Sequence, residues 1–186
     1  MRKLIYSIAT SLDGYINDAS GSLDWVPVDE EYHRFANALQ AATGLSIYGT
    51  NMWRTMVFWN TAEGQPGSPD YVDEFARLWK PSAKLVVSHT LGEADLAAGA
   101  KLFRGDLVAE VKRLKAEPGG EISVSGATIA TSLVDAGLVD EIRPFIVPAV
   151  LGGGTRFLSA TSASKFELVE THSFKNGMTY LRCVKR

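Results

Sequence analysis

The chain has 186 residues, of which 46% are hydrophobic and 22% charged, and its formal net charge is −2. This composition is typical of a folded globular domain and excludes a disordered chain. No basic run offers a nucleic-acid interface, no apolar run approaches the ~18 residues of a membrane span, and the single cysteine, Cys183, excludes an internal disulfide.

The N-terminal segment indicates a cytoplasmic protein. Asp13 follows Met1 too closely for the apolar core of a signal peptide to form, so we expect no export signal. A single thiol fits a reducing cytoplasm. No His-Glu-x-x-His run and no cysteine–histidine cluster occurs, and we therefore expect no metal site.

Hydrophobic periodicity predicts alternating strands and helices in the first half of the chain. Residues 29–42 have helical spacing with acids in the first turn, and Gly44 is predicted to end this helix. The segment 60–70 is rich in glycine, proline and serine, so we expect it to be irregular. The other predicted elements are strands over 4–10 and 45–48, a short segment after the turn at 49–51, and a helix over 71–79.

The second half continues the alternation and ends in a hairpin. Asp106 is the predicted N-cap of a helix over 107–116, and Asn176-Gly177 predicts a type I′ turn. Strands alternating with helices favour an α/β fold with a largely parallel sheet, which the hairpin makes mixed. The remaining elements are strands over 84–88, 102–103, 121–125 and 141–147, a helix over 128–136, a loop over 148–154, and hairpin strands over 166–173 and 178–184.

The segment 121–142 is the most informative part of the chain, because it predicts a strand, a glycine turn, a helix and a second strand. Gly126 breaks the first strand, and Gly137 stands where a helix commonly ends in the left-handed conformation. A helix that starts directly after a strand presents free N–H groups and the positive end of its dipole. The segment therefore predicts an anion site, although an ordinary strand-to-helix connection has the same pattern.

Three motifs, in order along the chain, resemble one known family. They are Ser-Leu-Asp-Gly-Tyr-Ile at 11–16, Ala-Gly-Leu-Val-Asp-Glu at 136–141 and Pro-Ala-Val-Leu-Gly-Gly-Gly at 148–154. They resemble the reductase domain of bifunctional riboflavin-biosynthesis deaminase-reductases, in the dihydrofolate reductase-like superfamily. The resemblance implies one domain over residues 1–186 with three layers: a mixed, mostly parallel central sheet, helices on both faces and a C-terminal β-hairpin.

The resemblance also implies an NADPH site at the carboxyl ends of the central strands. The pyrophosphate would lie at the turn and helix start formed by Ser125, Gly126, Ala127, Thr128 and Ile129. A second cofactor loop would be formed by Gly49, Thr50 and Asn51. Three residues depart from the family pattern. Ser125 replaces a glycine, Met52 replaces a threonine, and Thr50 replaces an arginine that would bind phosphate bidentately.

Two more segments are implied to contact the cofactor. Ser88 and His89 correspond to the strand end near the adenosine 2′-phosphate, and Gly152 and Gly153 lie in a loop near the cofactor. Each has an ordinary alternative. Ser88 is also a typical turn residue, His89 a typical solvated surface residue, and the glycine loop a typical surface turn.

Carboxylates that could relay a proton to a substrate lie in two places. The resemblance points to the start of the helix over 29–42, where counting from the tryptophan gives Glu30 and counting from the proline gives Asp29. Asp13 is the other candidate, because the family places the loop after the first strand beside nicotinamide and substrate. Acids in a first helical turn also stabilise the helix dipole, and an Asp-Gly pair also forms a plain turn.

Trp25 and Trp53 are the predicted substrate-stacking residues, although such aromatics are more often core. Taken together, the chain is predicted to be an NADPH-dependent reductase of a small, pterin-like or pyrimidine-like heterocycle. The alternative is a dinucleotide- or ligand-binding module of the same fold without turnover. We expect no nucleic-acid or membrane partner, and a homodimer formed through the strand at 145–148 and the terminal hairpin.

Overall fold

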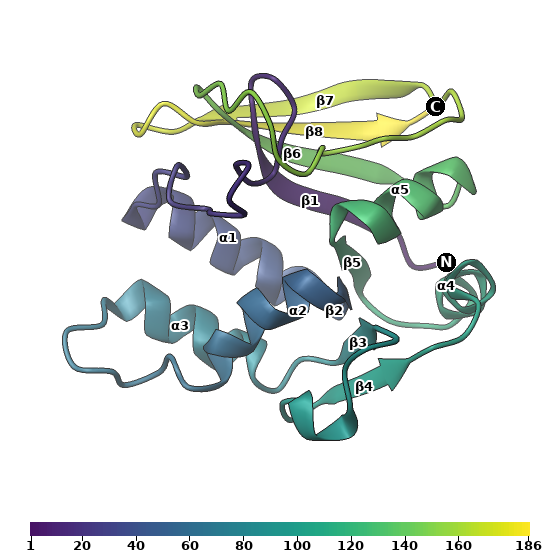
Figure 1. The fold of residues 1–186 in the computed structure, drawn as a ribbon, viewed down its shortest axis with the longest axis horizontal. Coiled ribbons are helices and arrows are strands. Elements are labelled where there is room, and N and C mark those ends of the chain that lie inside the picture. The colour runs from purple at the N-terminus through teal and green to yellow at the C-terminus, as the bar shows by residue number, and fades with distance from the viewer.

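Figure 1 shows the computed structural model of the chain, which describes residues 1–186 as an eight-stranded sheet with helices packed on it. The strands are β1 Leu4–Ser11, β2 Thr43–Gly49, β3 Lys84–Val87, β4 Ala100–Phe103, β5 Glu121–Ser125, β6 Glu141–Val147, β7 Phe166–Ser173 and β8 Thr179–Lys185. They lie in the order β4-β3-β2-β5-β1-β6-β8-β7. All pairs from β4 to β6 are parallel, whereas β8 runs antiparallel to both of its neighbours.

Five α-helices and two 3₁₀ turns connect these strands. The helices are α1 Glu30–Ala42, α2 Thr50–Met56, α3 Asp70–Trp79, α4 Leu107–Ala116 and α5 Ala127–Asp135, and the 3₁₀ turns are η1 Val57–Asn60 and η2 Glu93–Asp95. None of the helices combines the length and the apolar character that crossing a bilayer requires.

The helices cover both faces of the sheet. On one face, Val111 of α4 and Leu133 of α5 are fully buried in one cluster with Ile122 of β5. On the other face, the α1 ring of Phe35 packs edge-on against Phe145 of β6, 5.9 Å between centroids, and α3 packs against β2 and β3. The predicted three-layer α/β fold, with its mixed, mostly parallel sheet and C-terminal hairpin, is confirmed.

The ends of α5 explain why this segment was predictable. Gly137 has a φ of 70°. Its N–H donates to the Val134 carbonyl and that of Leu138 to the Leu133 carbonyl, both at 2.9 Å. This is the Schellman pattern, which glycine adopts without steric cost. At the start of α4, the Asp106 carboxylate accepts the N–H of Ala109 at 3.1 Å, as the sequence predicted.

Gly44 does not end α1 but lies inside β2, contrary to the prediction. The helix already ends at Thr43, whose N–H donates to the Gln40 carbonyl and whose hydroxyl donates to the Leu39 carbonyl. Gly44 instead interrupts the pairing of β2 with β5. A Cβ at this position would stand 2.9 Å from the Gly120 nitrogen, so the glycine is needed for close strand approach.

The hairpin forms where it was predicted, but its turn is not type I′. A type I′ turn needs positive φ at two residues, whereas Gly177 has a φ of 90° and no residue other than glycine has a positive φ. The N–H of Phe174 donates to the Met178 carbonyl and that of Gly177 to the Phe174 carbonyl, which gives a three-residue loop. Asn176 is held by its side chain, which donates to the Pro27 carbonyl at 2.7 Å.

The segment predicted to form a dimer edge lies mostly in β6, inside the sheet. Residues 145–147 belong to this strand, which is paired on both sides, with β1 and with β8. The free edges of the sheet are β4 and β7. Of the two segments predicted to form the dimer edge, only the hairpin has a free strand edge, in β7, and the homodimer stays a prediction.

Candidate functional site

The turn between β5 and α5 leaves backbone N–H groups free at the start of a helix. Gly126 joins the two elements with a φ of 127°, a conformation that glycine adopts far more readily than other residues. The first hydrogen bond of α5 runs from the Ala130 N–H to the Gly126 carbonyl at 3.0 Å. The N–H groups of Ala127, Thr128 and Ile129 precede it and have no partner within the helix. With the helix dipole, they form a positively polarised surface made of backbone alone.

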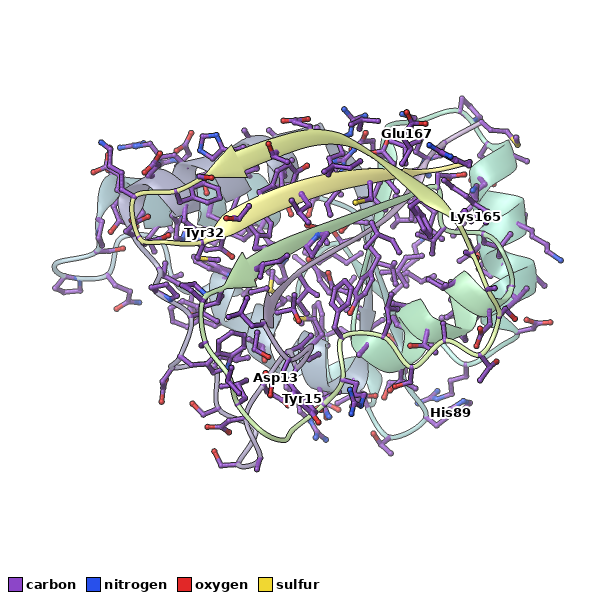
Figure 2. All side chains as sticks on the ribbon, turned by 90° about the horizontal axis from the view of Figure 1, so that it is seen from above. Asp13, Tyr15, Tyr32, His89, Lys165 and Glu167 are labelled. Atoms are coloured by element: carbon purple, nitrogen blue, oxygen red, sulfur yellow. The ribbon has the colours of Figure 1, made fainter.

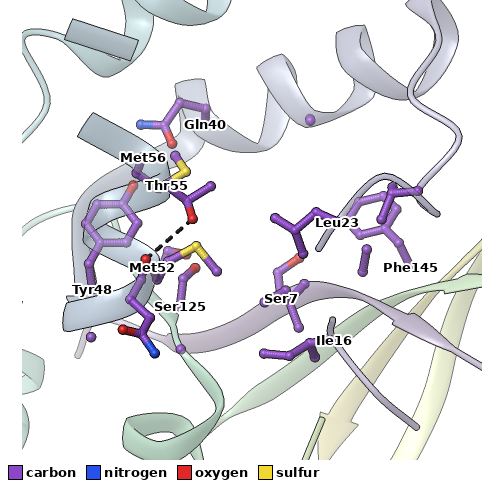
Figure 3. Close-up of a pocket in the computed structure, with 18 of the residues that line it drawn as sticks. Ser7, Ile16, Leu23, Gln40, Tyr48, Met52, Thr55, Met56, Ser125 and Phe145 are labelled. Carbon is purple, nitrogen blue, oxygen red and sulfur yellow. Dashed lines mark hydrogen bonds between the residues drawn. The ribbon is translucent and has the colours of Figure 1, made fainter. Parts of the chain in front are cut away.

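A cleft of about 1130 Å³ opens beside this turn (Figure 3). Its walls come from α1, α2, η1, α3 and the loop between β1 and α1, and its floor comes from β1, β5 and β6. Of the 39 lining residues, 22 are hydrophobic. A concave, mainly apolar cavity with a few polar groups is the usual form of a small-molecule site.

Aromatic side chains form much of the wall. The ring of Tyr32 meets Phe145 edge-on at 5.2 Å, and the ring of Trp59 is tilted against Phe75 at 4.4 Å. Three further apolar lining residues are exposed at 42%, 58% and 57%: Leu23, Val28 and Phe58. Covering such surfaces with a flat ligand is favourable, because apolar area leaves water.

The floor carries the only lysine or arginine of the lining, Arg143. Its Nη1 and Nη2 donate to the two carboxylate oxygens of Glu121 at 3.2 and 3.1 Å. Its Nε and Nη2 donate to Glu141 Oε2 at 2.9 and 2.6 Å. One guanidinium is thus shared by two carboxylates.

Glu141 is fully buried and is the centre of an ion network behind the cleft. It also accepts from Lys3 at 2.7 Å and from Arg182 at 2.8 and 3.0 Å. Burial favours the neutral acid, but the hydrogen bonds from Arg182, Lys3 and Arg143 outweigh it and hold the pKa of Glu141 well below its usual range. Glu141 therefore stays ionised at neutral pH.

The structure brings one group of predicted cofactor residues together at one end of the cleft. The carboxyl ends of β2 and β5 lie side by side, with Tyr48 paired to Ser125. The predicted residues in the lining are Gly49, Thr50, Asn51, Ser125, Gly126, Ala127, Thr128 and Ile129.

Ser88 and His89 lie outside the cleft. Ser88 is 3% exposed, and its Oγ accepts from Thr50 Oγ1 at 2.8 Å and from the N–H groups of Thr90 and Leu91 at 3.2 and 3.1 Å. Its hydroxyl thus organises its own turn and anchors Thr50. His89 is exposed on the surface (Figure 2).

Asp13, Gly152 and Gly153 belong to a second arrangement outside the lining. The Asp13 carboxylate accepts from Ser11 Oγ at 2.6 Å and from the N–H groups of Leu151 and Gly152 at 3.1 and 2.8 Å. The hydrogen bond from Ser11, followed by those from Gly152 and Leu151, lowers the pKa of Asp13 to about 2. At neutral pH this carboxylate is an acceptor that holds the glycine-rich loop, with no proton to give.

The two acids at the start of α1 also point away from the cleft. Asp29 is the N-cap, and its carboxylate accepts the N–H of Tyr32 at 2.9 Å. Glu30 accepts from Arg34 Nε at 2.8 Å on the exposed side of the helix. Neither residue lines the cleft.

Both predicted stacking tryptophans lie outside the lining. Trp53 is 1% exposed, its ring stacks on Trp79 at 5.9 Å, and its indole N–H donates to the Asp95 carbonyl. Trp25 is half-buried and donates to the Ser22 carbonyl at 3.2 Å. The aromatic wall is made instead by residues such as Tyr32 and Trp59.

The polar floor was missed by sequence reasoning, although a signal was present. In β5 the apolar residues Ile122 and Val124 alternate with Glu121, Ser123 and Ser125, and the polar three line the cleft. A strand in the middle of a sheet covered on both faces should be apolar on both. Polar residues at alternate positions of such a strand therefore indicate a cavity on that face.

The chain has an open α/β sheet, a glycine turn into a helix at the carboxyl end of β5, and a large cleft beside that turn. This is the architecture of α/β proteins in which ligands commonly bind at the carboxyl edge of the sheet. The family described as the RibD C-terminal domain matches residues 2–180, and the chain belongs to this family. The Bacillus subtilis protein YyaP, described as uncharacterized, is 30% identical over 185 residues, 97% of this chain and 93% of its own.

Solved structures agree with this fold. A putative riboflavin biosynthesis protein from Shewanella sp. superposes with a TM-score of 0.74 at 24% identity, over 99% of both chains. A Thermotoga maritima diaminohydroxyphosphoribosylaminopyrimidine deaminase/5-amino-6-(5-phosphoribosylamino)uracil reductase gives 0.68 at 14% identity, over 100% of this chain and 57% of its own. A dihydrofolate reductase from Enterococcus faecalis complexed with NADP(H) gives 0.62 at 12% identity, over 99% and 96%. The dihydrofolate reductase-like fold is thereby confirmed.

Proposed function

We propose that the protein is an NADPH-dependent reductase of a small heterocyclic substrate, pterin-like or pyrimidine-like. The observation that carries the proposal is the backbone anion site of Ala127, Thr128 and Ile129, which opens into a cleft of about 1130 Å³. Two relatives of the same fold are named for pyrimidine reduction or for a complex with NADP(H), which supports the same chemistry.

The residues at this end of the cleft fit a dinucleotide pyrophosphate. Gly126 has no side chain to keep an anion from the free N–H groups. The carboxylate of the lining, Glu121, stands at the opposite end of β5, four residues or about 13 Å from Ser125 along the strand. Thr50 stands where the family has an arginine, and no other arginine lines this end of the cleft. The backbone N–H groups would therefore provide most of the affinity for phosphate.

The rest of the cleft would orient cofactor and substrate rings. A bound nicotinamide supplies a hydride, and the protein supplies binding and orientation. The rings of Tyr32, Trp59 and Phe145 offer apolar surfaces on which planar groups lie flat. The imidazole of His33 meets the rings of Trp59 and Phe75 edge-on, at 5.6 and 5.7 Å between centroids. Burial lowers the pKa of His33, so its imidazole is neutral at neutral pH.

One observation favours the alternative of a binding module without turnover. No acid with a free proton faces the cleft, because Glu121 is paired with Arg143 and the acids at the start of α1 point elsewhere. Steady oxidation of NADPH in the presence of a pterin or pyrimidine separates the two functions. Turnover supports the reductase, and tight cofactor binding with no turnover on any such substrate supports the module.

The test of the cofactor site is a charge placed at the start of α5. Thr128 is exposed in the first helical turn. In Thr128→Asp the new carboxylate stabilises the helix by about 0.3–1 kcal/mol, yet it should repel a bound pyrophosphate. We expect NADPH affinity, measured by calorimetric titration, to fall roughly ten-fold or more while the melting temperature is unchanged or higher.

The matched control is Ser132→Asp, which adds the same charge to an exposed position one turn further along α5. We expect it to bind NADPH nearly as the wild type does. Equal affinity in wild type and Thr128→Asp would refute the site. Gly126→Val is a poorer test, because the φ of 127° strains any branched residue there and a Cβ would stand 3.3 Å from the Gly49 nitrogen.

A further inference from the structure

The cleft holds no cation that is free to bind a negatively charged substrate. Arg143 is the only lysine or arginine in its lining, and it is bound to Glu121 and Glu141 through four contacts of 2.6–3.2 Å. The other group that could carry positive charge, His33, is kept neutral by burial, which lowers its pKa. A phosphate placed over Arg143, away from the turn at the start of α5, would lose its water without gaining a counter-charge.

The charges around Arg143 balance without a ligand. The network joins three cations to three carboxylates: Lys3, Arg143 and Arg182 with Glu121, Glu141 and Glu170. The arginines nearest in sequence to other lining residues do not change this balance. Arg34, Arg54 and Arg156 are exposed and absent from the lining. Arg34 is paired with Glu30 and Asp70 at 2.8 and 2.9 Å, and the Arg156 guanidinium lies over the Tyr15 ring at 5.0 Å.

The cleft has neutral polar groups where a free cation is missing. The side-chain nitrogen of Gln40 is buried, lines the cleft and has no hydrogen-bond partner. Ser123 of β5 also lines the cleft. Ser7 of β1 lines it too (Figure 3); its hydroxyl donates to the Arg143 carbonyl at 3.0 Å and can accept a further hydrogen bond. A primary amide can donate and accept side by side, which matches the edge of a cyclic amide. A buried donor without a partner also costs free energy that a ligand can recover.

We propose that the substrate of this cleft is an uncharged, phosphate-free, flat molecule with a cyclic-amide edge, which Gln40 recognises. The inference rests on the proposed function for the location of the substrate. It differs from what the family resemblance would suggest, since the Thermotoga maritima relative is named for a phosphoribosyl compound. Arg143 is the residue that would have to bind such a phosphate, and Glu121 neutralises it.

The experiment compares riboflavin with flavin mononucleotide, two probes that share one flat ring with a cyclic-amide edge and differ by a phosphate. We expect the wild type to bind riboflavin at least about ten-fold more tightly, as measured by quenching of flavin fluorescence. Tighter or equal binding of the phosphorylated probe would overturn the proposal. Failure of the wild type to bind riboflavin at its solubility limit would also overturn it.

Glu121→Gln tests the physical cause. This change removes one carboxylate from Arg143, and the Glu121 side chain is 29% exposed, so the fold can accept the amide. We expect the preference for riboflavin to fall several-fold, because the guanidinium then carries uncompensated charge. Glu170→Gln removes a carboxylate from the same network outside the cleft, 3.6 Å from Arg182, and should leave the preference as in the wild type. Identical preferences in the two variants would contradict the role given to Glu121.

Gln40→Met keeps the length of the side chain and removes its hydrogen-bonding groups. We expect riboflavin to bind roughly five-fold more weakly to it, and unchanged affinity would show that the amide is not used. Neither flavin titration requires NADPH. Riboflavin binding without NADPH binding would therefore reject the proposed reductase while leaving the inference about charge in place.

Discussion

At the scale of single residues, the Asp13 carboxylate fixes the position of a loop by accepting hydrogen bonds from its backbone. Its oxygens accept from Ser11, Leu151 and Gly152, and these hydrogen bonds tie the end of β1 to the glycine-rich loop that follows β6. The loop also needs its glycines. A Cβ at Gly154 would lie 2.0 Å from the Asn17 carbonyl oxygen. The motifs around 11–16 and 148–154 are therefore two halves of one contact.

Asp13→Asn is expected to lower the melting temperature at pH 7, because an amide has one acceptor oxygen where the carboxylate has two. The pKa of Asp13 falls from 3.8 to about 2 on folding. A lowered pKa stabilises the fold fully above the unfolded value and loses that effect as the pH falls through the folded value. The difference in melting temperature between wild type and variant should therefore shrink between pH 4 and pH 2, as followed by circular dichroism. A constant difference down to pH 2 would mean that the charge of Asp13 is irrelevant.

Residue identity made part of the site predictable. Glycine at positions 126 and 137 indicated a positive φ, which both residues have. The free N–H groups were predictable because a helix that begins directly after a strand leaves its first N–H groups without helical partners. The roles of Asp29 and Trp53 depend on the direction of their side chains. The Asp29 side chain faces the N–H groups of its own helix, and the Trp53 side chain faces the core between α2 and α3. The spacing of residues in the sequence does not predict these directions.

At the scale of elements, buried charges connect the strands beneath the cleft. Glu141 on β6 binds Lys3, which precedes β1, and Arg182 on β8, and through Arg143 it is joined to Glu121 on β5. The strands β5 and β6 are not neighbours, since β1 lies between them. The contact between Glu121 and Arg143 therefore depends on strand order, which local sequence patterns do not contain.

Glu141→Gln is expected to destabilise the protein by roughly 3–5 kcal/mol, because it leaves Arg143 and Arg182 without the acceptor that compensates their burial. Urea unfolding measures this loss. Glu170→Gln is the control in the same network. Its partner Arg182 is 31% exposed and 3.6 Å away, so its loss should cost less than about 1 kcal/mol. Similar values for the two variants would contradict the central place of Glu141.

Element boundaries were predicted best where the chain carries its own stop signals. Helix α4 and strand β5 lie at the predicted residues because Asp106 caps the one and Gly126 ends the other. The predicted end of α1 was wrong, because Gly44 lies in β2 and is required there by its close contact with Gly120 on the chain beside it. The predicted type of hairpin turn was also wrong, and the Asn176 side chain in that turn donates to the Pro27 carbonyl. Both errors come from contacts between segments far apart in the chain.

At the scale of the whole molecule, the order of strands creates the site. The parallel strands β2 and β5 bring Gly49 and the start of α5 to one edge of the sheet. The cleft beside that edge is lined by residues of the helices α1, α2 and α3 and of the strand β1. The two ends of this cleft differ. One has free backbone N–H groups, and the other has a floor whose charged groups are paired with one another.

The most direct measurement is the change in backbone amide resonances when NADPH is added to ¹⁵N-labelled protein. We expect the largest shifts on Ala127, Thr128 and Ile129, followed by residues of the cleft lining such as Asn51. Amides around Ser88 should move less, because their loop lies outside the cleft. Shifts confined to other surfaces, or none at all at saturating NADPH, would contradict the central claim that this turn and cleft hold the cofactor.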